Sequence, residues 1–449
     1  MLVFFARHKI LFFQILPLLL AGGIVVAPLG LIIAPIGFFY LLSKGKHESI
    51  ILFFVLMLIL GDSRIPWLQY IKHTRIELLV LIAGFSIYEI RRGVYQLSKY
   101  YLYFLPFFFI ALLSLAFSPI LSLGIQKTFS FALLYFVLLH YIRHRFTYNG
   151  QEIIRDLLYM FHFILLIGLV LLPIFPVVVS FGGVRFNGLL GNPNGLGIFI
   201  TLVTPLTILV FKYTPQISKR YRTLAWFLII LSLILCSSRN AIFSFTIFML
   251  LYQGLNGTTF KRFIFIFVFL PIAVLVVYNI ELESLVVSLG LEKYFRIKDF
   301  ESGSGRIFAW QHAWDLVQVN PLIGCGFACE EYNFIFKTTY RLWATGHQGG
   351  VHNSYLAYLV NTGYIGFFMY IGFLFSIIRK AIDRNFLFPY LAAVMFSAMF
   401  ESWVFSSLSA YHIIFVLTIV WLNASAEQPV LMEAEPVNRS NLPKIQGFS

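Results

Sequence analysis

The stretch "NSYLAYLVNTGYIGFFMYIGFLFSII", from Asn353 to Ile378, decides the fold class. It contains no Asp, Glu, Lys or Arg, and it is longer than the about 20 residues that a helix needs to cross a bilayer. Comparable apolar runs recur from Ile10 to Leu422. Within lipid only helices and closed barrels satisfy all their backbone hydrogen bonds, and these runs are too continuous for a barrel. The sequence therefore predicts an all-α polytopic membrane protein.

The composition of the whole chain agrees with this fold class. Hydrophobic residues make up 59% of the chain, charged residues only 12%, and the mean hydropathy is +0.85, far from the balance of a soluble domain. We predict about 12 to 14 transmembrane helices, several of them short. They are expected near residues 10–25, 27–42, 49–61, 76–90, 100–117, 128–142, 157–180, 194–211, 224–237, 241–252, 263–279, 353–378, 386–400 and 404–422.

The net charge of +14 indicates an orientation in the membrane rather than a nucleic-acid partner, because the basic residues gather in alternate connections. By the positive-inside rule these connections face the cytoplasm, so both termini are expected inside. Three basic residues, Arg64, Lys72 and Arg75, do not fit the alternation. The connections expected inside carry Arg7 and Lys9; Lys44 and Lys46; Arg91, Arg92 and Lys99; Arg143, Arg145 and Arg155; Lys212, Lys219, Arg220 and Arg222; Lys261 and Arg262; and Arg379, Lys380 and Arg384.

This topology divides the chain into four parts. Residues 1–279 form the N-terminal transmembrane helices, and residues 280–351 form one large external region with short amphipathic helices. Residues 352–422 form the C-terminal transmembrane helices, and residues 423–449 lose the apolar pattern and predict a disordered cytoplasmic tail. Cys325 and Cys329 would face an oxidising compartment, and the sequence leaves open whether they form a disulfide.

Polar residues concentrate in the outward-facing connections. A carrier usually places such residues at the bilayer midplane, within broken helices. Here each outer connection contributes an Arg or a His at one face, which favours a site at the membrane surface. The segments are "FGGVRFNGLLGNPNGLG" (181–197), "CSSRNA" (236–241), "GSGRIFAWQHAW" (303–314) and "GHQGGVHNSYL" (346–356).

Two arginines in these connections have both a functional and a structural interpretation. Arg239 lies in a tight turn between two apolar spans, where an unpaired Arg near lipid costs roughly 2.5 to 3.5 kcal/mol, so a negative partner is expected. The alternative is that its side chain extends to the headgroups. Arg185 has the same ambiguity in a glycine-rich turn. Asn192 and Asn194, in "GNPNG", predict a helix start.

The segment "SGSGRIFAWQHAWDLVQVNPLIGCGF" predicts an amphipathic outer helix. Ser304 is expected to cap it, and Arg306 lies in its first turn, where the helix dipole and a guanidinium together favour phosphate oxygens. Its apolar side chains recur at helical spacing and are expected to pack on the bundle or the membrane interface rather than on a sugar. This stripe consists of Ile307, Trp310, Trp314 and Val317.

His352 precedes the apolar stretch and is either a boundary residue or part of a reaction centre, with His347 as a possible assistant. The single histidines His140, His162 and His412 are expected in the hydrogen-bonded core. The acidic pairs Asp299 with Glu301 and Glu281 with Glu283 lack supporting ligands, so we expect solvated loop charges there rather than a metal site.

Four of these motifs occur in the order found in a known family. "VRFNGLLGNPNGLG", the "SSRNA" turn, "GSGRIFAWQHAW" with "NPLIGCGF", and "VHNSYLAYLVNTGYIGFF" resemble the O-antigen ligase and Wzy-type O-antigen polymerase family over roughly residues 180–380. The resemblance implies a GT-C-like fold and a metal-independent, inverting glycosyltransferase without cofactors, working at the periplasmic face of a bacterial inner membrane. Its partners would be an undecaprenyl-diphosphate-linked glycan donor and a glycan or lipid A core acceptor, in lipopolysaccharide or exopolysaccharide assembly.

The resemblance also implies roles for individual residues. Arg239 and Arg306 match positions that bind the donor diphosphate, Arg185 matches the Arg before the Asn-Pro-Asn motif, and His352 matches the residue that serves the acceptor as catalytic base. His347, Asn353 and Asn194 are possible accessory residues. Several activities stay open on this scaffold: O-antigen ligase, O-antigen polymerase, protein O-oligosaccharyltransferase, and transporter of a small anion such as inorganic carbon.

Overall fold

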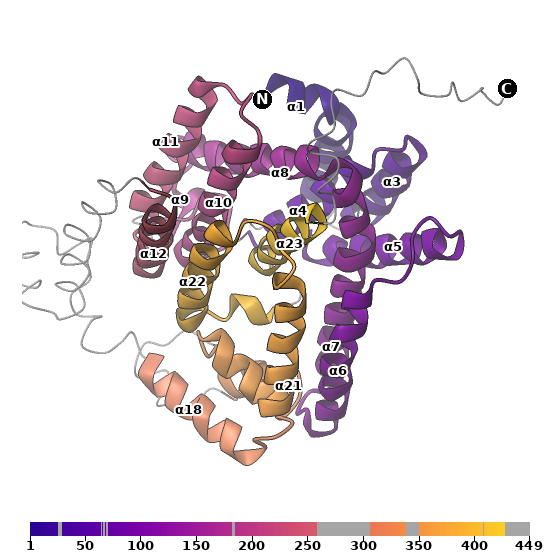
Figure 1. Ribbon diagram of the computed structural model, residues 1–449, viewed down its shortest axis with the longest axis vertical. Helices are drawn as coiled ribbons and strands as arrows, with labels where there is room; N and C mark the ends of the chain where they lie inside the picture. Colours follow the sequence, from indigo (N-terminus) through magenta and orange to yellow (C-terminus); the bar gives the residue numbers. More distant parts are fainter. Residues whose placement is uncertain are drawn as a thin grey trace, which may run out of the picture.

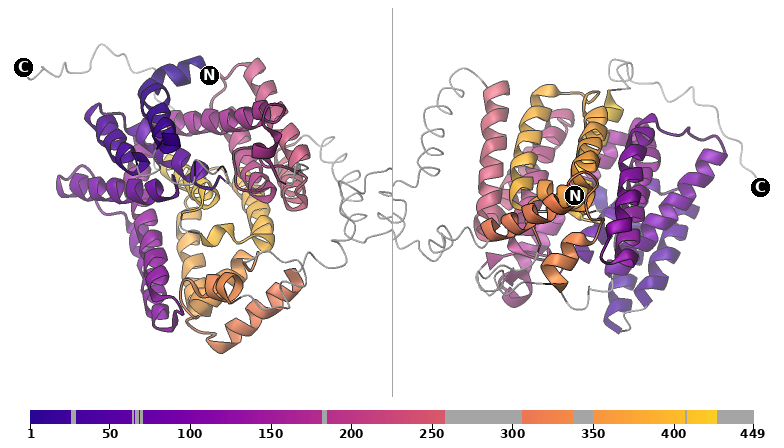
Figure 2. Two further views of the ribbon diagram at one scale, coloured as in Figure 1. Left: turned by 180° about the vertical axis from the view of Figure 1, so that it is seen from behind. Right: turned by 90° about the horizontal axis from the view of Figure 1, so that it is seen from below.

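The computed structural model describes residues 1–25, 29–63, 65, 68, 71–181, 185–257, 306–337, 350–406 and 408–426. Over these residues the chain is almost entirely helical, as Figures 1 and 2 show. The first half contains α1 (Leu2–Arg7), the π-helix η1 (Leu11–Ile15), α2 (Leu16–Val25), α3 (Leu29–Ser43), α4 (His47–Gly61), α5 (Ile71–Arg91), α6 (Lys99–Ser114), the 3-10 helix η3 (Leu115–Phe117), α7 (Leu121–Val137), the π-helix η4 (Leu138–Ile142), α8 (Arg143–Leu171) and α9 (Pro176–Val179).

A short hairpin separates this half from the next one. Strands β1 (Ser180–Phe181) and β2 (Arg185–Phe186) pair antiparallel, with Ser180 opposite Phe186. The second half contains α10 (Pro193–Tyr213), α11 (Lys219–Cys236), α12 (Arg239–Asn256), α18 (Arg306–Val319), α19 (Cys329–Glu331), the π-helix η7 (Tyr332–Phe336), α21 (Ser354–Ile378), α22 (Arg384–Phe400), the 3-10 helix η8 (Trp403–Phe405) and α23 (Ala410–Ser425).

The lengths and apolar character of the helices confirm the all-α polytopic membrane class. Four continuous helical segments among the described residues are long and apolar enough to cross a membrane: Lys99–Phe117, Leu121–Leu171, Pro193–Tyr213 and Ser354–Ile378. Shorter apolar helices lie at Leu11–Gly22, Leu29–Ser43, His47–Gly61, Arg384–Phe400 and Ala410–Ser425. The total of spans stays a prediction, since the expected span at 263–279 lies outside the described residues.

The expected spans at 128–142 and 157–180 lie on either side of a kink. The helical run Leu121–Leu171 is kinked at Asn149, which has non-helical backbone angles and lies in the polar connection between the two expected spans. The second expected span continues beyond the helix, which ends at Leu171. Polar side chains at and before the kink bind other helices. Arg145 donates to Glu89 at 2.5 Å, and Asn149 donates to Glu48 at 2.8 Å.

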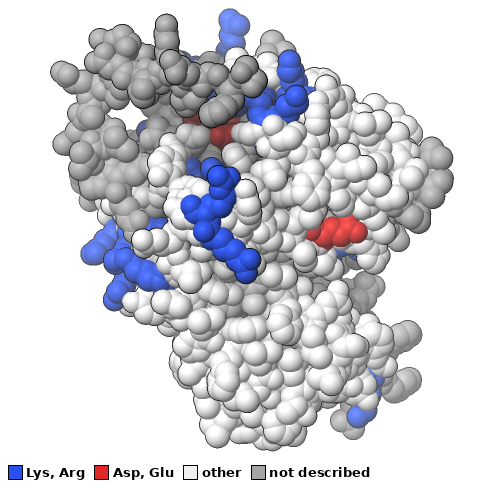
Figure 3. All heavy atoms as spheres, turned by 90° about the vertical axis from the view of Figure 1, so that its right-hand side faces the viewer, with Lys and Arg blue, Asp and Glu red and all other residues white. Residues whose placement is uncertain are grey.

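The outer surface of the bundle is strongly apolar. Leu102 and Phe109 on α6 are more than half exposed, at 55% and 60%. Figure 3 shows the side of the molecule on which α5, α6 and α7 lie in Figure 1, and a broad surface in the lower centre of the view carries no charged side chains. A water-soluble protein rarely exposes so large an apolar surface, so this face fits contact with lipid tails.

Helix α21 is interrupted at Gly363, where φ is +63°. The backbone that follows α18 inserts at this break: Tyr364 N–H donates to Pro321 O at 2.8 Å, and Cys325 N–H donates to Val360 O at 2.9 Å. A Cβ on Gly363 would collide with the carbonyl group of Leu322, which explains why glycine is required. The insertion attaches the segment after α18 directly to α21.

A disulfide joins Cys325 to Cys329 just beyond this insertion. The sequence left this bridge open, and the structure shows it. Cys236, which was expected to fill space in a helix, is buried and unbridged at the end of α11.

Candidate functional site

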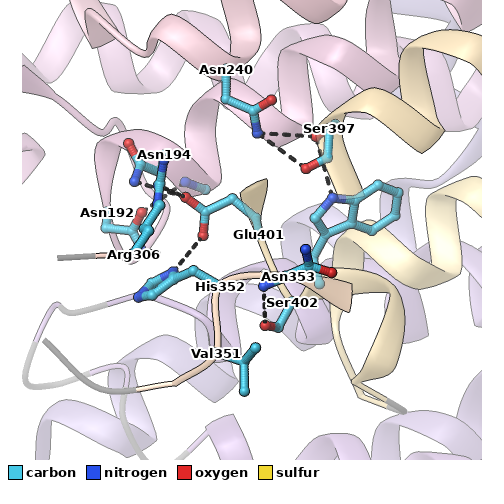
Figure 4. Close-up of polar contacts among 12 residues, drawn as sticks. Asn192, Asn194, Asn240, Arg306, Val351, His352, Asn353, Ser397, Glu401 and Ser402 are labelled. Carbon is cyan, nitrogen blue, oxygen red and sulfur yellow. Dashed lines mark hydrogen bonds and ion pairs between the residues drawn. The ribbon is translucent and has the colours of Figure 1, made fainter. Parts of the chain in front are cut away.

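Glu401 is the centre of a polar cluster that collects residues from widely separated parts of the chain. It follows the last residue of α22, and its side chain is only 10% exposed. Its Oε1 accepts from Arg306 Nη2 at 2.9 Å and from Asn194 Nδ2 at 3.0 Å, and its Oε2 lies 3.0 Å from His352 Nδ1. Figure 4 shows these three side chains pointing toward the carboxylate. Two of the predicted site residues, Arg306 and His352, thus meet on one acidic group.

The backbone around His352 is held in an unusual conformation. His352 has a φ of +47°, in the left-handed region that non-glycine residues rarely occupy. The next two residues fix it: Asn353 N–H donates to Ser402 Oγ at 3.1 Å, and Ser354 Oγ donates to Glu401 O at 2.7 Å. The segment before α21 is therefore clamped onto residues 401–402, which orients the imidazole toward Glu401.

Asn353 has a structural position in this arrangement. Its Oδ1 accepts from Tyr355 N at 2.9 Å and from Leu356 N at 3.1 Å, so it caps α21. Asn192 caps α10 in the same way, accepting from Gly195 N at 2.8 Å. The helix start predicted at "GNPNG" is confirmed, and this cap aims the neighbouring Asn194 at Glu401.

Arg185 supports the site from β2. Its guanidinium donates to Cys236 O at 3.2 Å, to Ser237 O at 3.3 Å and to Asn194 Oδ1 at 3.1 Å. It therefore joins the hairpin to the turn between α11 and α12, and it reaches Glu401 through Asn194. These contacts place Arg185 in a supporting layer behind the carboxylate.

Arg239 is the first residue of α12 and directly follows the turn that Arg185 holds. The adjacent Asn240 donates to Ser397 O and Oγ, each at 3.3 Å. Since Ser397 lies one helical turn before Glu401 on α22, the start of α12 is fixed close to the cluster, as Figure 4 shows for Asn240. The structure thus brings Arg306, His352 and Asn194 onto Glu401 directly, and it places Arg185 and Arg239 at the adjoining turn.

The electrostatics of the cluster favour a charged imidazole. Burial lowers the pKa of His352, but the hydrogen bond and the charge of Glu401 raise it more, so the pKa lies above its ordinary value. A second carboxylate, Glu330, accepts from Val351 N at 2.9 Å, and burial raises its pKa. The His352 side chain nevertheless keeps 30% of its surface exposed, so the imidazole can be reached from outside.

Helix α18 forms over the predicted segment and contains Arg306, and its apolar stripe divides between the two expected environments, the bundle and the membrane surface. The buried face consists of Ala309, Ala313 and Val317, whereas Ile307 and Trp314 are about half exposed. The physical reason is that small residues let the helix approach α21 closely, and the larger ones can remain in an apolar environment at the membrane surface. Trp310 does pack inward, donating to Val351 O at 3.1 Å beside His352.

The remaining histidine predictions are confirmed. His140 Nδ1 lies 2.8 Å from Phe136 O, His162 Nδ1 lies 2.7 Å from Tyr221 Oη, and His412 Nε2 lies 2.9 Å from Tyr135 Oη, all within the helix bundle. No group of three or more His, Cys, Asp or Glu that could hold a metal ion occurs among the described residues. Several sequence candidates lie outside the described residues: His347, Ser304, Glu281, Glu283, Asp299 and Glu301.

Sequence reasoning missed the two buried carboxylates of this site, Glu401 and Glu330. A signal for Glu401 was present, because it is an isolated acidic residue between the predicted spans at 386–400 and 404–422. An ionisable residue at such depth is costly unless it is paired or functional. Glu330 offered no comparable signal, since it lies in a polar segment next to Glu331.

The fold and this cluster define a polytopic membrane protein with an ionic site at one end of its helices. Residues 223–371 match the family model described as O-antigen ligase, so this part of the chain is an O-antigen ligase family domain and the predicted family is confirmed. The matched region contains Arg239, Arg306 and His352, and it supports a glycosyltransferase of the O-antigen ligase or polymerase type. No curated protein matches the chain.

Proposed function

We propose that the protein transfers a glycan from an undecaprenyl-diphosphate donor to a sugar hydroxyl at the periplasmic face of a bacterial inner membrane. In this proposal it acts as an O-antigen polymerase or ligase in surface polysaccharide assembly, as an inverting enzyme that uses arginines where others use a metal ion. The family match supports the general class, and the site residues support the donor and the reaction type.

The observation that carries the proposal is the His352–Glu401 pair. Glu401 engages Nδ1 of the imidazole at 3.0 Å, so in the neutral tautomer Nδ1 carries the proton and Nε2 accepts one. A carboxylate that fixes the tautomer and orientation of an imidazole is the usual arrangement for a general base. A sugar hydroxyl is a poor nucleophile at neutral pH, which is why the reaction needs such a base.

The reaction has a balanced path through these groups. The acceptor oxygen attacks the anomeric carbon of the donor sugar, and its proton passes to His352 Nε2. The bond between the anomeric carbon and the diphosphate oxygen breaks, and undecaprenyl diphosphate leaves with the electron pair. Attack opposite to the leaving group inverts the anomeric configuration.

The leaving diphosphate needs positive charge near the membrane surface. Arg306 stands at the N-terminus of α18, where backbone N–H groups and the helix dipole also favour an anion. Arg239 stands at the N-terminus of α12 in the same way. Each charge-assisted hydrogen bond to the phosphate oxygens would contribute about 1.5 to 3 kcal/mol. Arg185 would then act by positioning the turn that carries Arg239.

Two observations support a proposed orientation in the membrane. The Cys325–Cys329 disulfide lies next to the outer half of α21 and favours an oxidising compartment for this end of the molecule. The basic connections expected in the cytoplasm include Lys99 and Arg143, which lie at the opposite end of the bundle. We therefore propose that the site faces the periplasm and that both termini face the cytoplasm.

The test is the surface polysaccharide profile of a deletion strain that expresses wild-type protein, His352→Ala or His73→Ala. His73 is an exposed histidine on α5 and serves as the matched control. We expect His352→Ala to abolish the polymer at unchanged protein level in the membrane, and His73→Ala to restore it. Normal polymer from His352→Ala would overturn the proposal.

The profile of the deletion strain also separates the activities that the sequence leaves open. Loss of all polymer from the lipid A core indicates a ligase, and a single attached repeat indicates a polymerase. Loss of glycan from protein alone would instead indicate a protein O-oligosaccharyltransferase. Saturable bicarbonate uptake by liposomes that contain the protein and no lipid-linked donor would support the transporter.

A further inference from the structure

A second polar site lies at the end of the bundle opposite to His352. A cavity of about 410 Å³ opens between the segment before α6 and the junction of η4 and α8. Among the described residues, its lining includes Lys99, Arg143 and His144 but no Asp or Glu. Glu89, on the neighbouring α5, is held by Arg145 at 2.5 Å. The cavity therefore has an excess of positive charge.

The two cationic side chains are arranged around one aromatic ring. Lys99 Nζ lies 5.6 Å from the ring centre of Tyr100, and Arg143 Cζ lies 5.2 Å from it. Both cations are thus held at the cavity wall by the ring, and Arg143 Nε also donates to Asn423 Oδ1 at 3.4 Å. Ser98 is another lining residue, and its buried Oγ has no hydrogen-bond partner within the described part of the chain. Donors and positive charge of this kind suit a phosphate group.

The position of the cavity is fixed by the residues around Tyr100. Asn423 Nδ2 donates to Tyr100 Oη at 3.1 Å and to Ile377 O at 2.8 Å. Ile377 lies at the C-terminal end of α21, whereas His352 precedes its N-terminal end. Helix α21 therefore lies between the two sites, with His352 before its first residue and the cavity near its last turn.

We propose that this cavity binds the phosphate headgroup of an anionic lipid from the cytoplasmic leaflet. The lipid is favoured over a free anion because the cavity lies at the very start of the span Lys99–Phe117. Leu97, at the rim, is 60% exposed, and Leu102 and Phe109 continue an exposed apolar surface along α6. A phosphate in the cavity would therefore have acyl chains along that surface. Anionic lipids are enriched in the cytoplasmic leaflet, and basic pockets on that side of membrane proteins bind their headgroups.

The proposal does not depend on the transfer reaction and is tested with the purified full-length protein in detergent. The midpoint of thermal unfolding is measured during titration with dioleoyl phosphatidylglycerol, dioleoyl phosphatidylcholine or inorganic phosphate. The variants are Lys99→Gln and Arg143→Gln, and the control is Lys219→Gln, an exposed lysine at the start of α11. Native mass spectrometry of the folded proteins counts the retained phosphatidylglycerol independently of stability.

We expect phosphatidylglycerol to raise the midpoint, with phosphatidylcholine and inorganic phosphate having little effect. Lys99→Gln should weaken the apparent affinity by about fivefold, which is the effect of one basic side chain near an anionic surface, and Lys219→Gln should not. Arg143→Gln should likewise retain less phosphatidylglycerol in the folded state. Equal stabilisation by phosphatidylcholine or by inorganic phosphate alone, or wild-type retention by both cavity variants, would overturn the proposal.

Discussion

Two histidine–carboxylate pairs in this protein have the same geometry and different surroundings. His8 Nε2 lies 3.0 Å from Asp156 Oδ2, and His352 Nδ1 lies 3.0 Å from Glu401 Oε2. Arginine completes each group: Arg7 at 3.1 Å and Arg155 at 3.3 Å from Asp156, and Arg306 at 2.9 Å from Glu401. The pair itself therefore does not distinguish a structural cluster from a reactive one.

Access to the imidazole makes the difference. The His8 side chain is 1% exposed, and its second nitrogen is engaged by Ser49 Oγ at 2.8 Å. The His352 side chain is 30% exposed and stands on a strained backbone at the mouth of the bundle. The buried His8–Asp156 pair, the closed pair, joins the N-terminal segment to α8. The partly exposed His352–Glu401 pair, the open pair, can exchange a proton with a ligand. In this protein, the exposed fraction of the side chain distinguishes a candidate catalytic histidine better than its pairing with a carboxylate does.

Removing each imidazole tests whether His352 is catalytic and His8 only structural. We expect His352→Ala to lower the rate of glycan transfer about 100- to 10,000-fold, the usual contribution of a general base, with little change in thermal stability. His8→Ala should leave the rate per folded molecule unchanged and lower the free energy of unfolding by about 1 to 3 kcal/mol, because Asp156 loses a buried partner. Transfer assays and thermal unfolding of both variants check this. Equal losses of rate would show that both clusters only maintain the fold.

The carboxylates of the two clusters, Glu401 and Asp156, are also expected to differ in function. Glu401→Gln keeps the shape of the side chain and removes the charge shared by Arg306 and His352. We expect about a tenfold to hundredfold lower kcat, because the imidazole loses its orienting and charge-stabilising partner. Asp156→Asn, the matched change in the closed cluster, should affect unfolding alone. Steady-state kinetics with a lipid-linked donor measure the difference, and an unchanged kcat for Glu401→Gln would remove Glu401 from the mechanism.

The pH dependence of activity tests whether His352 acts as a general base that Glu401 influences. A general base must be neutral, so activity should fall as pH drops through the pKa of His352, which Glu401 raises above its ordinary value despite burial. In Glu401→Gln the raising interactions are lost, and the acidic limb of kcat should move to lower pH. The raised pKa also means that protonated His352 stabilises the fold at low pH and that this contribution is lost as pH rises through the folded pKa. If the acidic limb of the kcat profile does not shift in Glu401→Gln, His352 is not the general base.

The smallest effect is expected from the supporting layer. Asn194→Ala removes one hydrogen bond to Glu401 and one to Arg185, and it should lower the free energy of unfolding by about 1 to 2 kcal/mol with a modest loss of rate. Asn256→Ala, which removes amide contacts to Tyr252 O and Asn385 O at the far end of α12, serves as the control. A loss of rate as large as that of His352→Ala would mean that Asn194 contacts the substrate itself.

Local features of this fold could be predicted from the sequence, and contacts between distant segments could not. The apolar spans, the cap at Asn192 and a helix over the segment that contains Arg306 depend on neighbouring residues, and the structure confirms them. Glu401 was missed because its partners come from residues 194, 306 and 352, which no local pattern connects.

Two further features were only partly predictable. The stripe on α18 was expected on the bundle or the membrane interface, but periodicity defines a face of a helix without stating its surroundings, and it could not show that Trp314 would remain half exposed. The supporting contacts of Arg185 could not be predicted for a related reason. Its backbone acceptors, Cys236 O and Ser237 O, lie on another helix and have no sequence signature.

The break at Gly363 limits how the protein can be divided into parts. Pro321 to Gly326 supply hydrogen-bond partners to the backbone of α21, so a piece of the external region completes a membrane helix. A chimera that exchanged the outer region alone would need to preserve this docking, or it would leave backbone polar groups unsatisfied beside lipid. The transferable unit in this chain is therefore α18, the disulfide segment and α21 together, because these hydrogen bonds join segments that a division at the predicted boundary near residue 351 would separate.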